Sequence, residues 1–475
     1  MMRSTRVEST AHAAASIAAV LLLAALPRSA AGQAPAQQCL LQYETSSGNT
    51  RTNAVKTPSG QYNFFQGGGV TYHCEGQNNT LQADSAEYYG DQKVLYLIRN
   101  VHYTEPRAKV DSDRMTYYQL EDRLRAEGNV NVRTETGTTI RGPVMDYYRA
   151  TTTRPLARTI ATGRPHMAII QRTASNDTPE PVDVVANVLT AEGDNLVYAS
   201  GNVEITRPDL IAKGDSAFLD GQREFARLLR SPSVQSRKGR PFTLTGGVID
   251  LFSRNKVLER VVATPSGHVL SQDLELTADS VDLRVRENQL QRVMAWGRKS
   301  RAQALSPERR MIADSIDAQM PGQRLREVRA VGKAYANSVP DTTRIVSTER
   351  DWMRGDVLVA EFDSIAPGDT ASKPQARRIV ATGDASSFYQ LAGNTTRRGL
   401  PNINYVRGRV INVSFVDKAV DKVEVTDQAS GVYLEPTETA GEAGTPSATK
   451  TSGVQERPAL PQQAPAPAPP RRRTP

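Results

Sequence analysis

The sequence has few of the residues from which a compact enzyme builds its core. Hydrophobic residues make up 38 % of the 475 residues and aromatic residues only 6 %, whereas compact domains use about 45–50 % apolar residues. Beyond residue 26 no segment approaches the roughly 18 apolar residues of a membrane-spanning helix. No long pattern with the helical period of 3.6 follows. Apolar residues nevertheless recur regularly, which excludes a wholly disordered chain.

Residues that carry chemistry are equally scarce. Gly67-Gly68-Gly69 lacks the Lys-Ser/Thr pair of a phosphate loop and predicts a bend. Gly214-Asp215-Ser216 could suggest a serine hydrolase, but similar triplets recur along the chain and predict turns at strand starts. We therefore expect no enzyme activity, no metal site and no cofactor. The histidines share no ligand spacing; they are His12, His73, His102, His166 and His268.

No block of one charge dominates, since 59 Lys and Arg oppose 51 Asp and Glu. The net charge of +8 favours anionic partners, although a solvated surface of mixed charge is the simpler interpretation. Arg3 and Arg6 precede the apolar residues 13–26, and small residues follow at 29–32. This pattern predicts a signal peptide over residues 1–32 and export to the periplasm, where nucleic acid is not an expected partner.

The chain has only two cysteines, Cys39 and Cys74. In an oxidising compartment they could form one disulfide that staples the N-terminal edge of the fold. Two unpaired thiols are the alternative, and the sequence does not decide between them.

Two short marks recur along the chain. The first is a small residue followed by Asp and Ser, as in Ala83-Asp84-Ser85 and Ala278-Asp279-Ser280, with a weaker copy at Val110. The second is Ala-x-Gly, as in Ala126-Glu127-Gly128 and Ala295-Trp296-Gly297. Apolar residues alternate between the marks, which is the period of a half-buried strand. We expect about ten units of two strands each, hence an all-β, elongated repeat jellyroll or solenoid that is open at its ends.

The repeat divides the chain into regions. We expect a strand-poor N-terminal cap at 33–80 and the repeat array at 81–433, either continuous or as two sub-arrays, 81–170 and 182–433. A disordered tail rich in Pro, Ala and Thr follows at 434–475. Three polar interruptions predict loops: residues 171–181, 334–350 and 364–376. Twenty strands shared by two sheets would give an array ~50 Å long at ~4.8 Å per strand.

The combination of "ADS", strand, turn, strand and "AxGNV" resembles the OstA/LptA family of periplasmic lipopolysaccharide-transport proteins. Residues 81–137 carry the closest copies, and weaker copies extend to about 433. The resemblance implies a twisted β-jellyroll like those of LptA, LptC and the N-terminal part of LptD. Its interior would carry acyl chains, and its partners would be lipopolysaccharide or another anionic glycolipid and further jellyrolls. This chain is longer than a typical LptA, and its tail of about 40 residues is too short for the barrel of LptD.

Alternation identifies the residues that would line such a trough. They are Leu95, Leu97, Val130, Val132, Val203, Ile205, Leu274, Leu276, Val281, Leu283, Val410 and Val413. The function predicted is therefore binding and bridging of lipopolysaccharide through lipid A in outer-membrane biogenesis. End-to-end strand pairing would join neighbouring jellyrolls or copies of this chain. The alternatives are a structural or glycan-binding solenoid with a dry core, and a hydrolase or lyase on a repeat scaffold, for which convergent acidic residues are missing.

Overall fold

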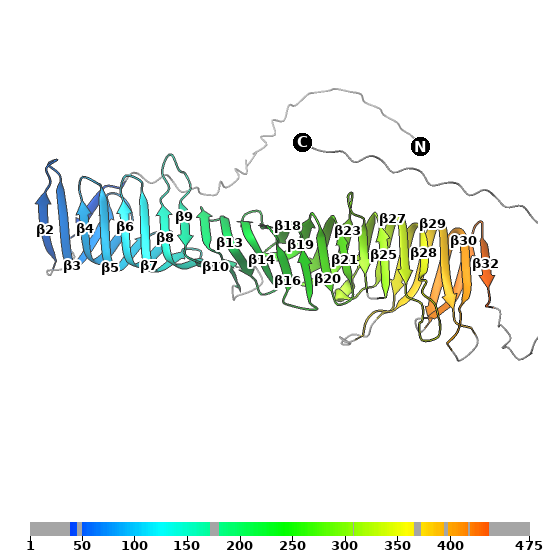
Figure 1. The fold of residues 1–475 in the computed structure, drawn as a ribbon. Coiled ribbons are helices and arrows are strands. Elements are labelled where there is room, and N and C mark those ends of the chain that lie inside the picture. The colour runs from blue at the N-terminus through cyan, green and yellow to red at the C-terminus, as the bar shows by residue number, and fades with distance from the viewer. Residues whose placement is uncertain are drawn as a thin grey trace, which may run out of the picture. The chain divides into compact units, whose positions relative to one another are not determined.

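The computed structural model describes residues 39–44, 50–171, 180–306, 308–364, 372–393, 398–416 and 419–436. The predicted signal peptide and all but the first residues of the predicted tail lie outside these ranges. The expected all-β class is confirmed, because the described residues form 32 strands and one short 3₁₀ turn, η1 (Pro321–Gln323). These strands belong to a unit that ends at Leu434, and within it they stand side by side (Figure 1).

The first half of the unit runs through β16. Its strands are β1 (Leu41–Glu44), β2 (Arg51–Lys56), β3 (Tyr62–Cys74), β4 (Thr80–Tyr89), β5 (Val94–Glu105), β6 (Ala108–Tyr118), β7 (Arg123–Thr134), β8 (Thr139–Tyr148), β9 (Arg158–Thr162), β10 (His166–Gln171), β11 (Glu180–Val185), β12 (Val188–Glu192), β13 (Leu196–Thr206), β14 (Leu210–Asp220), β15 (Phe225–Leu229) and β16 (Ser233–Ser236).

The second half continues to β32. Its strands are β17 (Phe242–Thr245), β18 (Val248–Arg254), β19 (Val257–Thr264), β20 (Gly267–Ser271), β21 (Glu275–Ala278), β22 (Ser280–Arg286), β23 (Gln289–Trp296), β24 (Ala302–Leu305), β25 (Arg309–Ala313), β26 (Ser315–Gln319), β27 (Glu327–Ser338), β28 (Asp351–Phe362), β29 (Ala376–Leu391), β30 (Asn402–Val416), β31 (Ala419–Thr426) and β32 (Ser430–Leu434).

The long strands each take part in two separate antiparallel ladders. In β5, residues 94–98 pair with 85–89 of β4, whereas Tyr103 and its neighbours pair with the beginning of β4. We call the ladder through 94–98 ladder A and the ladder through Tyr103 ladder B. Ladder A continues through β9, β12 and β15, and ladder B through β10, β11 and β16. Some strands are interrupted at the corner, and their two halves then carry separate numbers. Each half still belongs to one ladder, as β9 belongs to ladder A and β10 to ladder B.

A corner divides each long strand where it passes from one ladder to the other. The register between β4 and β5 shifts between Gln82 and Ser85, and the residues opposite, Arg99 and Asn100, have φ of 62° and 50°. The amide of Asn100 donates to the Asp84 carboxylate at 3.0 Å. The two sequence marks therefore meet at the corner, where the Asp of one strand binds the left-handed pair of the next. In the long strands β4 and β14 the first mark lies at a corner within the strand, whereas at Asp279 and Asp314 it directly precedes the starts of β22 and β26, as predicted.

The same contact recurs with different donors farther along the chain. The amide of Asn129 donates to Asp113 at 2.9 Å, so the mark in β6 is centred on Asp113 and not on the weaker copy predicted at Val110. At Asp279 the hydroxyl of Ser300 and the backbone N–H of Lys299 donate instead. These hydrogen bonds lower the pKa of Asp279 to about 2, because they stabilise the ionised carboxylate.

Glycine occupies the second mark for two physical reasons. At Gly332 φ is +88°, which side chains with a Cβ rarely adopt. A Cβ at this position would also lie 2.4 Å from a carboxylate oxygen of Asp314. The triplet Gly67-Gly68-Gly69 forms a corner of the same kind, with φ of 88° and 96° at its last two residues, in agreement with the predicted bend.

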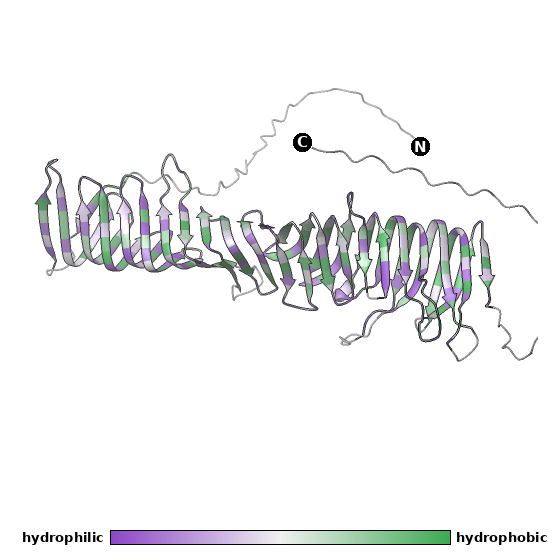
Figure 2. Ribbon diagram, in the orientation of Figure 1, coloured by the Kyte–Doolittle hydropathy of each residue, from purple (hydrophilic) through white to green (hydrophobic). Residues whose placement is uncertain are grey.

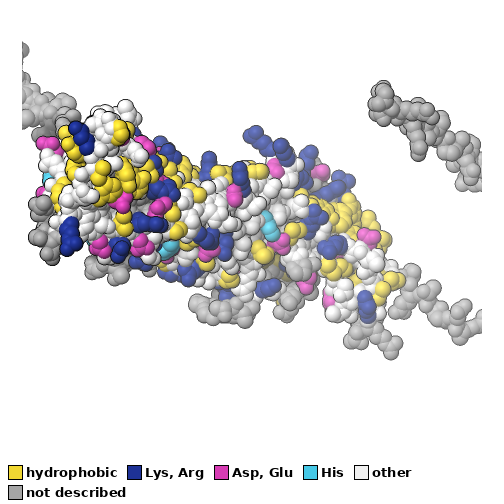
Figure 3. Space-filling model, turned by 60° about the vertical axis from the view of Figure 1, so that its left-hand side comes forward, with side chains coloured by type: hydrophobic (Ala, Val, Ile, Leu, Met, Phe, Trp, Pro, Cys, Tyr) yellow, Lys and Arg dark blue, Asp and Glu magenta, His cyan; other side chains and the backbone are white. Residues whose placement is uncertain are grey.

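The core lies between the ladders as one continuous hydrophobic cluster from Cys39 to Val413. Apolar residues alternate with polar ones along each strand, as the green and purple bands of the ribbon show (Figure 2). The inward residues meet those of the facing ladder, and the outward residues carry charges of both signs. Lys, Arg, Asp and Glu are interspersed on the face shown in Figure 3, which fits the mixed-charge surface expected from composition.

Each ladder contains about twice as many stacked strand segments, which we call rungs, as the sequence predicted for each sheet. The predicted length assumed that each strand belongs to one sheet, which gave ten rungs per sheet. Because a long strand supplies a rung to both ladders, each ladder has about twenty rungs, or on the order of 100 Å of stacked backbone at ~4.8 Å per strand. The pairing runs from β8 through β10 and β11 to β13 without interruption, so the two predicted sub-arrays share continuous ladders.

Two predicted boundaries were wrong. The segment 33–80, predicted to be strand-poor, contains β1, β2 and β3. β3 pairs with β4, and β1 and β2 pair with β3, so the segment extends both ladders. Within the predicted loop 334–350, residues 334–338 continue β27 along β28. The other two predicted loops contain residues 172–179 and 365–371, which lie outside the described part of the chain. Cys39 and Cys74 are joined by a disulfide in the structure.

Replacing the corner glycine Gly332 with alanine should destabilise the protein. We expect a loss of about 1–3 kcal/mol, because the left-handed conformation becomes strained and the new methyl group collides with Asp314. The measurement is the midpoint of urea unfolding. Gly67→Ala is the matched control, since a methyl group added at Gly67 would meet nothing within 4 Å and its φ is not positive. Equal midpoints for the two variants would contradict this account of the corner.

One buried carboxyl group makes stability depend on pH. Asp351 begins β28 and is 8 % exposed, and the backbone N–H of Gln390 donates to it at 2.9 Å. Burial raises the pKa of Asp351 to about 6, above its value of about 3.9 in the unfolded chain. The folded state therefore binds the proton more tightly. The resulting stability is fully present below about pH 4 and is lost as the pH rises through about 6.

Asp351→Asn should remove this pH dependence, because an amide keeps an oxygen acceptor without the buried charge. Relative to the unchanged protein, we expect the variant to gain up to about 3 kcal/mol at pH 7.5 and much less at pH 4. Urea unfolding of both proteins at the two pH values measures the difference. A gain of the same size at pH 4 and pH 7.5 would show that ionisation of Asp351 is not its cause.

Candidate functional site: a cavity at the seam between the ladders

The edge opposite the corners is where the ladders can separate. Turns of ladder A there face turns of ladder B, and we call this line of facing turns the seam. Arg107 in the turn after β5 lies 3.7 Å from Asp194 in the turn before β13. Farther along, Arg207 in the turn after β13 donates to the hydroxyl of Ser253 and the carbonyl of Lys256. Side chains, not backbone ladders, therefore close the seam at these two crossings.

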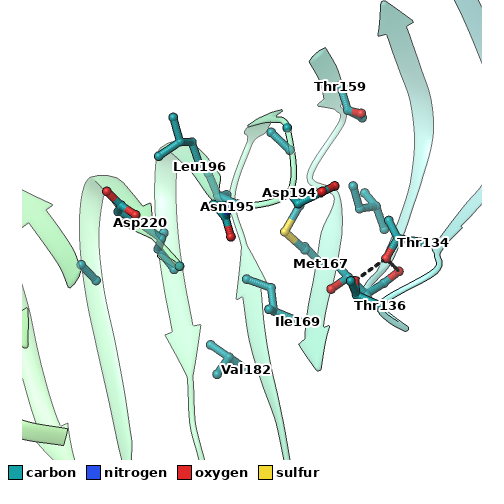
Figure 4. Close-up of a pocket in the computed structure, with 18 of the residues that line it drawn as sticks. Thr134, Thr136, Thr159, Met167, Ile169, Val182, Asp194, Asn195, Leu196 and Asp220 are labelled. Carbon is teal, nitrogen blue, oxygen red and sulfur yellow. Dashed lines mark hydrogen bonds between the residues drawn. The ribbon is translucent and has the colours of Figure 1, made fainter. Parts of the chain in front are cut away.

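A cavity of about 210 Å³ lies between the ladders at this part of the seam. Strands β7, β8, β10, β11, β13 and β14 supply its inner walls, and the close-up shows Met167, Ile169 and Val182 within it (Figure 4). Most inward residues here are aliphatic, because the alternation along each strand sends every second side chain between the ladders. The other apolar lining residues include Val132, Ile140, Met145, Ala157, Leu196, Val197, Ile205, Leu210, Ala212 and Leu251.

Polar turns surround the cavity where it reaches the seam. Thr134, Thr136 and Thr138 come from the turn between β7 and β8, and the hydroxyls of Thr134 and Thr136 lie 2.8 Å apart. Asp194 and Asn195 come from the facing turn between β12 and β13. The close-up shows Thr134 and Thr136 on one side and Asn195 on the other (Figure 4). The site thus combines an apolar interior with a hydrogen-bonding rim, the arrangement of an amphiphile site.

A buried polar cluster forms the N-terminal wall of the cavity. The carboxylate of Glu105 accepts hydrogen bonds from the hydroxyls of Tyr103 at 2.7 Å and Tyr147 at 2.5 Å. These tyrosines come from facing ladders, and their ring centroids lie 6.4 Å apart. Beyond them the guanidinium of Arg149 contacts Asp122 at 3.6 Å. The cluster therefore joins the ladders across the interior, where an open trough would be continuous.

Burial and charge both act on this cluster. Burial raises the pKa of Tyr103 and of Tyr147 well above the ordinary value, and Glu105 adds to the effect. Burial by itself would lower the pKa of Arg149, but the neighbouring tyrosines, Glu105 and Asp122 outweigh it and raise that pKa. The tyrosines therefore stay neutral and Arg149 stays charged at physiological pH, so the wall is permanently polar.

The predicted lining residues fall into three groups. Val132 and Ile205 line the cavity. Val410 is half-buried and faces the side opposite to Ile411 and Val413, because the prediction read a spacing of three as an alternation. The others are buried at 6 % exposure or less within the continuous core; these are Leu95, Leu97, Val130, Val203, Leu274, Leu276, Val281, Leu283 and Val413.

Sequence reasoning did not identify the residues that distinguish the cavity from the rest of the core. Met145, Met167 and Leu210 are flanked by less buried residues, as core residues are elsewhere, so period alone cannot separate them. The rim turns gave a weak signal, the run Thr134–Thr138 with its three threonines. Arg149 was detectable in principle, because it ends the regular alternation of β8. Among the described residues, no group of three or more His, Cys, Asp or Glu could hold a metal ion.

Removing the charge of Arg149 should destabilise the N-terminal wall. We expect Arg149→Met to cost about 3–5 kcal/mol, because it leaves the buried carboxylate of Asp122 and the half-buried one of Glu105 without their cationic neighbour. Urea unfolding followed by tyrosine fluorescence measures this effect. Arg141→Met, at an exposed arginine of the preceding strand β8, is the control and should change stability by less than about 0.5 kcal/mol. A neutral Arg149→Met variant would contradict the proposed burial of charge.

Comparison with known proteins agrees with the architecture of this region. Residues 54–163 match the model of a family described as "Lipopolysaccharide-assembly, LptC-related". The matched stretch runs from β2 to the corner after β9 and contains the polar wall. A search of curated proteins found no match. No helix within the described ranges has the length and apolar character to cross a membrane. Residues 54–163 are thus similar to the LptC-related family, a lipopolysaccharide-transport β-jellyroll family related to OstA/LptA, in agreement with the repeat resemblance.

Proposed function

We propose that this protein binds lipopolysaccharide by taking acyl chains of lipid A between its ladders and bridges the lipid's passage through the periplasm. The observation that carries the proposal is the apolar cavity opening at the seam next to a segment with the LptC-related match. This family is one of transport and binding, not of catalysis. The two features together favour a lipid carrier.

The energetics favour a site of this kind. Each methylene group that leaves water gains about 0.8 kcal/mol, so burying eight of them gains about 6 kcal/mol. The seam pair Arg107–Asp194 is solvent-exposed, with side-chain exposures of 39 % and 60 %, and such pairs contribute about 0–1 kcal/mol. Separating the turns at this crossing therefore costs little compared with the gain from sheltering an acyl chain.

The terminal strands provide the means of bridging. β2 pairs with β3, and its six residues are exposed. At the other end β32 pairs with β30, and Val432, Tyr433 and Leu434 are 52–54 % exposed. In Figure 3 hydrophobic side chains gather at the N-terminal end of the unit. Another jellyroll, or a second copy of this chain, could extend the ladders at these ends by adding strands.

A second candidate function rests on the outer face of ladder A. Tyr198, Phe218, Phe225 and Phe252 follow one another on neighbouring strands, with ring centroids 5.1, 6.4 and 5.3 Å apart. Arginines lie over two of these rings, Arg227 over Phe225 and Arg260 over Phe252. Tyr198 is 42 % exposed, and a row of aromatic rings that reaches the surface favours stacking of sugars there. In that case the chain would be a glycan-binding solenoid with a dry core.

Site-specific photocrosslinking distinguishes the two functions. A photoreactive residue at Ile205, which lines the cavity, should crosslink to lipopolysaccharide added to the purified protein or copurified with it. The control is Glu204, the next residue of β13, which faces outward. Crosslinking from Glu204 alone would contradict lipid binding between the ladders. Crosslinking confined to a photoreactive residue at Tyr198 would favour the glycan-binding alternative.

A further inference from the structure

The cations at the rim of the cavity already have acidic partners. Arg107 lies 3.7 Å from Asp194, and Lys256 lies 3.2 Å from Glu224. Arg207 is paired with Asp209 at 3.0 Å. An incoming phosphate would have to displace one of these carboxylates and would leave it near a second negative charge. The rim is therefore poorly suited to a charged head group.

Neutral hydrogen-bonding groups are present at the same rim. Thr136 and Asn195 are exposed and come from turns that face each other across the cavity (Figure 4). A hydroxyl and an amide can each donate and accept, so together they match the alternating donors and acceptors of sugar hydroxyls. Neither group offers a charge that would select a phosphate. The rim thus favours an uncharged, hydroxylated head.

The size of the cavity limits what it can hold. An apolar cavity of about 150 Å³ in another protein binds benzene, which has six carbon atoms. A cavity of about 210 Å³ therefore accommodates on the order of eight carbon atoms by the same scale. That is one alkyl segment, far less than all the acyl chains of a lipid A molecule. The polar wall of Tyr103, Glu105 and Tyr147 prevents the chain from extending toward the N-terminus.

We propose that the cavity binds a single alkyl chain of an amphiphile whose nearest head group is an uncharged sugar. This inference rests on the proposed function and specifies its ligand. The chain lies between β8, β10, β13 and β14, and the sugar hydroxyls bind Thr136 and Asn195 at the seam. Any phosphate of a larger glycolipid lies outside the rim, because the rim cations remain paired with carboxylates.

Two ligands with the same chain and different heads test the proposal. Binding of octyl glucoside and of octyl phosphate to the full-length protein is measured by isothermal titration calorimetry below their micelle concentrations. We expect octyl glucoside to bind at least tenfold more tightly than octyl phosphate. Methyl glucoside, which lacks the chain, should not bind. Equal or tighter binding of octyl phosphate would overturn the assignment of the head group.

Variants assign the binding to the cavity. Ala212 is 1 % exposed and lines the cavity from β14, so Ala212→Leu should weaken octyl glucoside binding at least tenfold by filling it. Its neighbour Lys213 faces outward, and Lys213→Leu should leave binding unchanged. Asp194→Asn, which frees Arg107 from its acidic partner, should improve octyl phosphate binding about threefold to tenfold. An unchanged affinity in both Ala212→Leu and Asp194→Asn would overturn the site.

The lipid crosslinking experiment separates this inference from the proposed function. If lipopolysaccharide crosslinks to position 205 but octyl glucoside does not bind, the single-chain site is wrong and the proposed function stands. If octyl glucoside binds and lipopolysaccharide does not crosslink, the cavity serves another glycolipid and the proposed function fails. Absence of both overturns both.

Discussion

The corner contact is the interaction on which the whole architecture depends. An antiparallel strand pair left flat would expose one apolar face, and a repeat of such pairs would not close around a core. Two consecutive left-handed residues turn strands such as β5 and β7 through the corner, and an Asp on the neighbouring strand accepts a hydrogen bond from the side chain there. Because the turn recurs in register, every inward side chain meets one from the other ladder.

The two-ladder construction also explains how a chain with few hydrophobic residues can enclose an apolar interior. The hydrophobic content of 38 % suffices because each rung needs only its inward residues to be apolar. At the two seam crossings described above, the ladders are held together by individual side chains such as Arg107 and Arg207 and not by backbone pairing. A site that opens along the seam therefore requires no change in either ladder. The backbone ladders hold the fold together, whereas side chains at the seam control access to the interior.

Much of the fold could be predicted from sequence because its two marks are local signals. Gly, Asn and Asp at corners reflect positive φ and short side-chain hydrogen bonds, which depend on neighbours a fixed distance away. The mistaken length arose because the marks do not reveal which half of a strand belongs to which ladder. The cavity was harder to predict. Ile205 inside it and Leu276 in packed core show the same alternation, and only the distance between the ladders distinguishes them.

The disulfide between Cys39 and Cys74 has a consequence for how such an array comes apart. In a stack where each rung touches only its neighbours, the terminal rungs have one neighbour and open first. The disulfide fastens the segment leading into β1 to the end of β3, so β1, the N-terminal rung of ladder B, cannot fray freely. The described C-terminal rung, β32, is held by its pairing with β30. The strands of ladder B should therefore separate first at the C-terminal end and then progressively toward the disulfide, so this ladder comes apart in one direction.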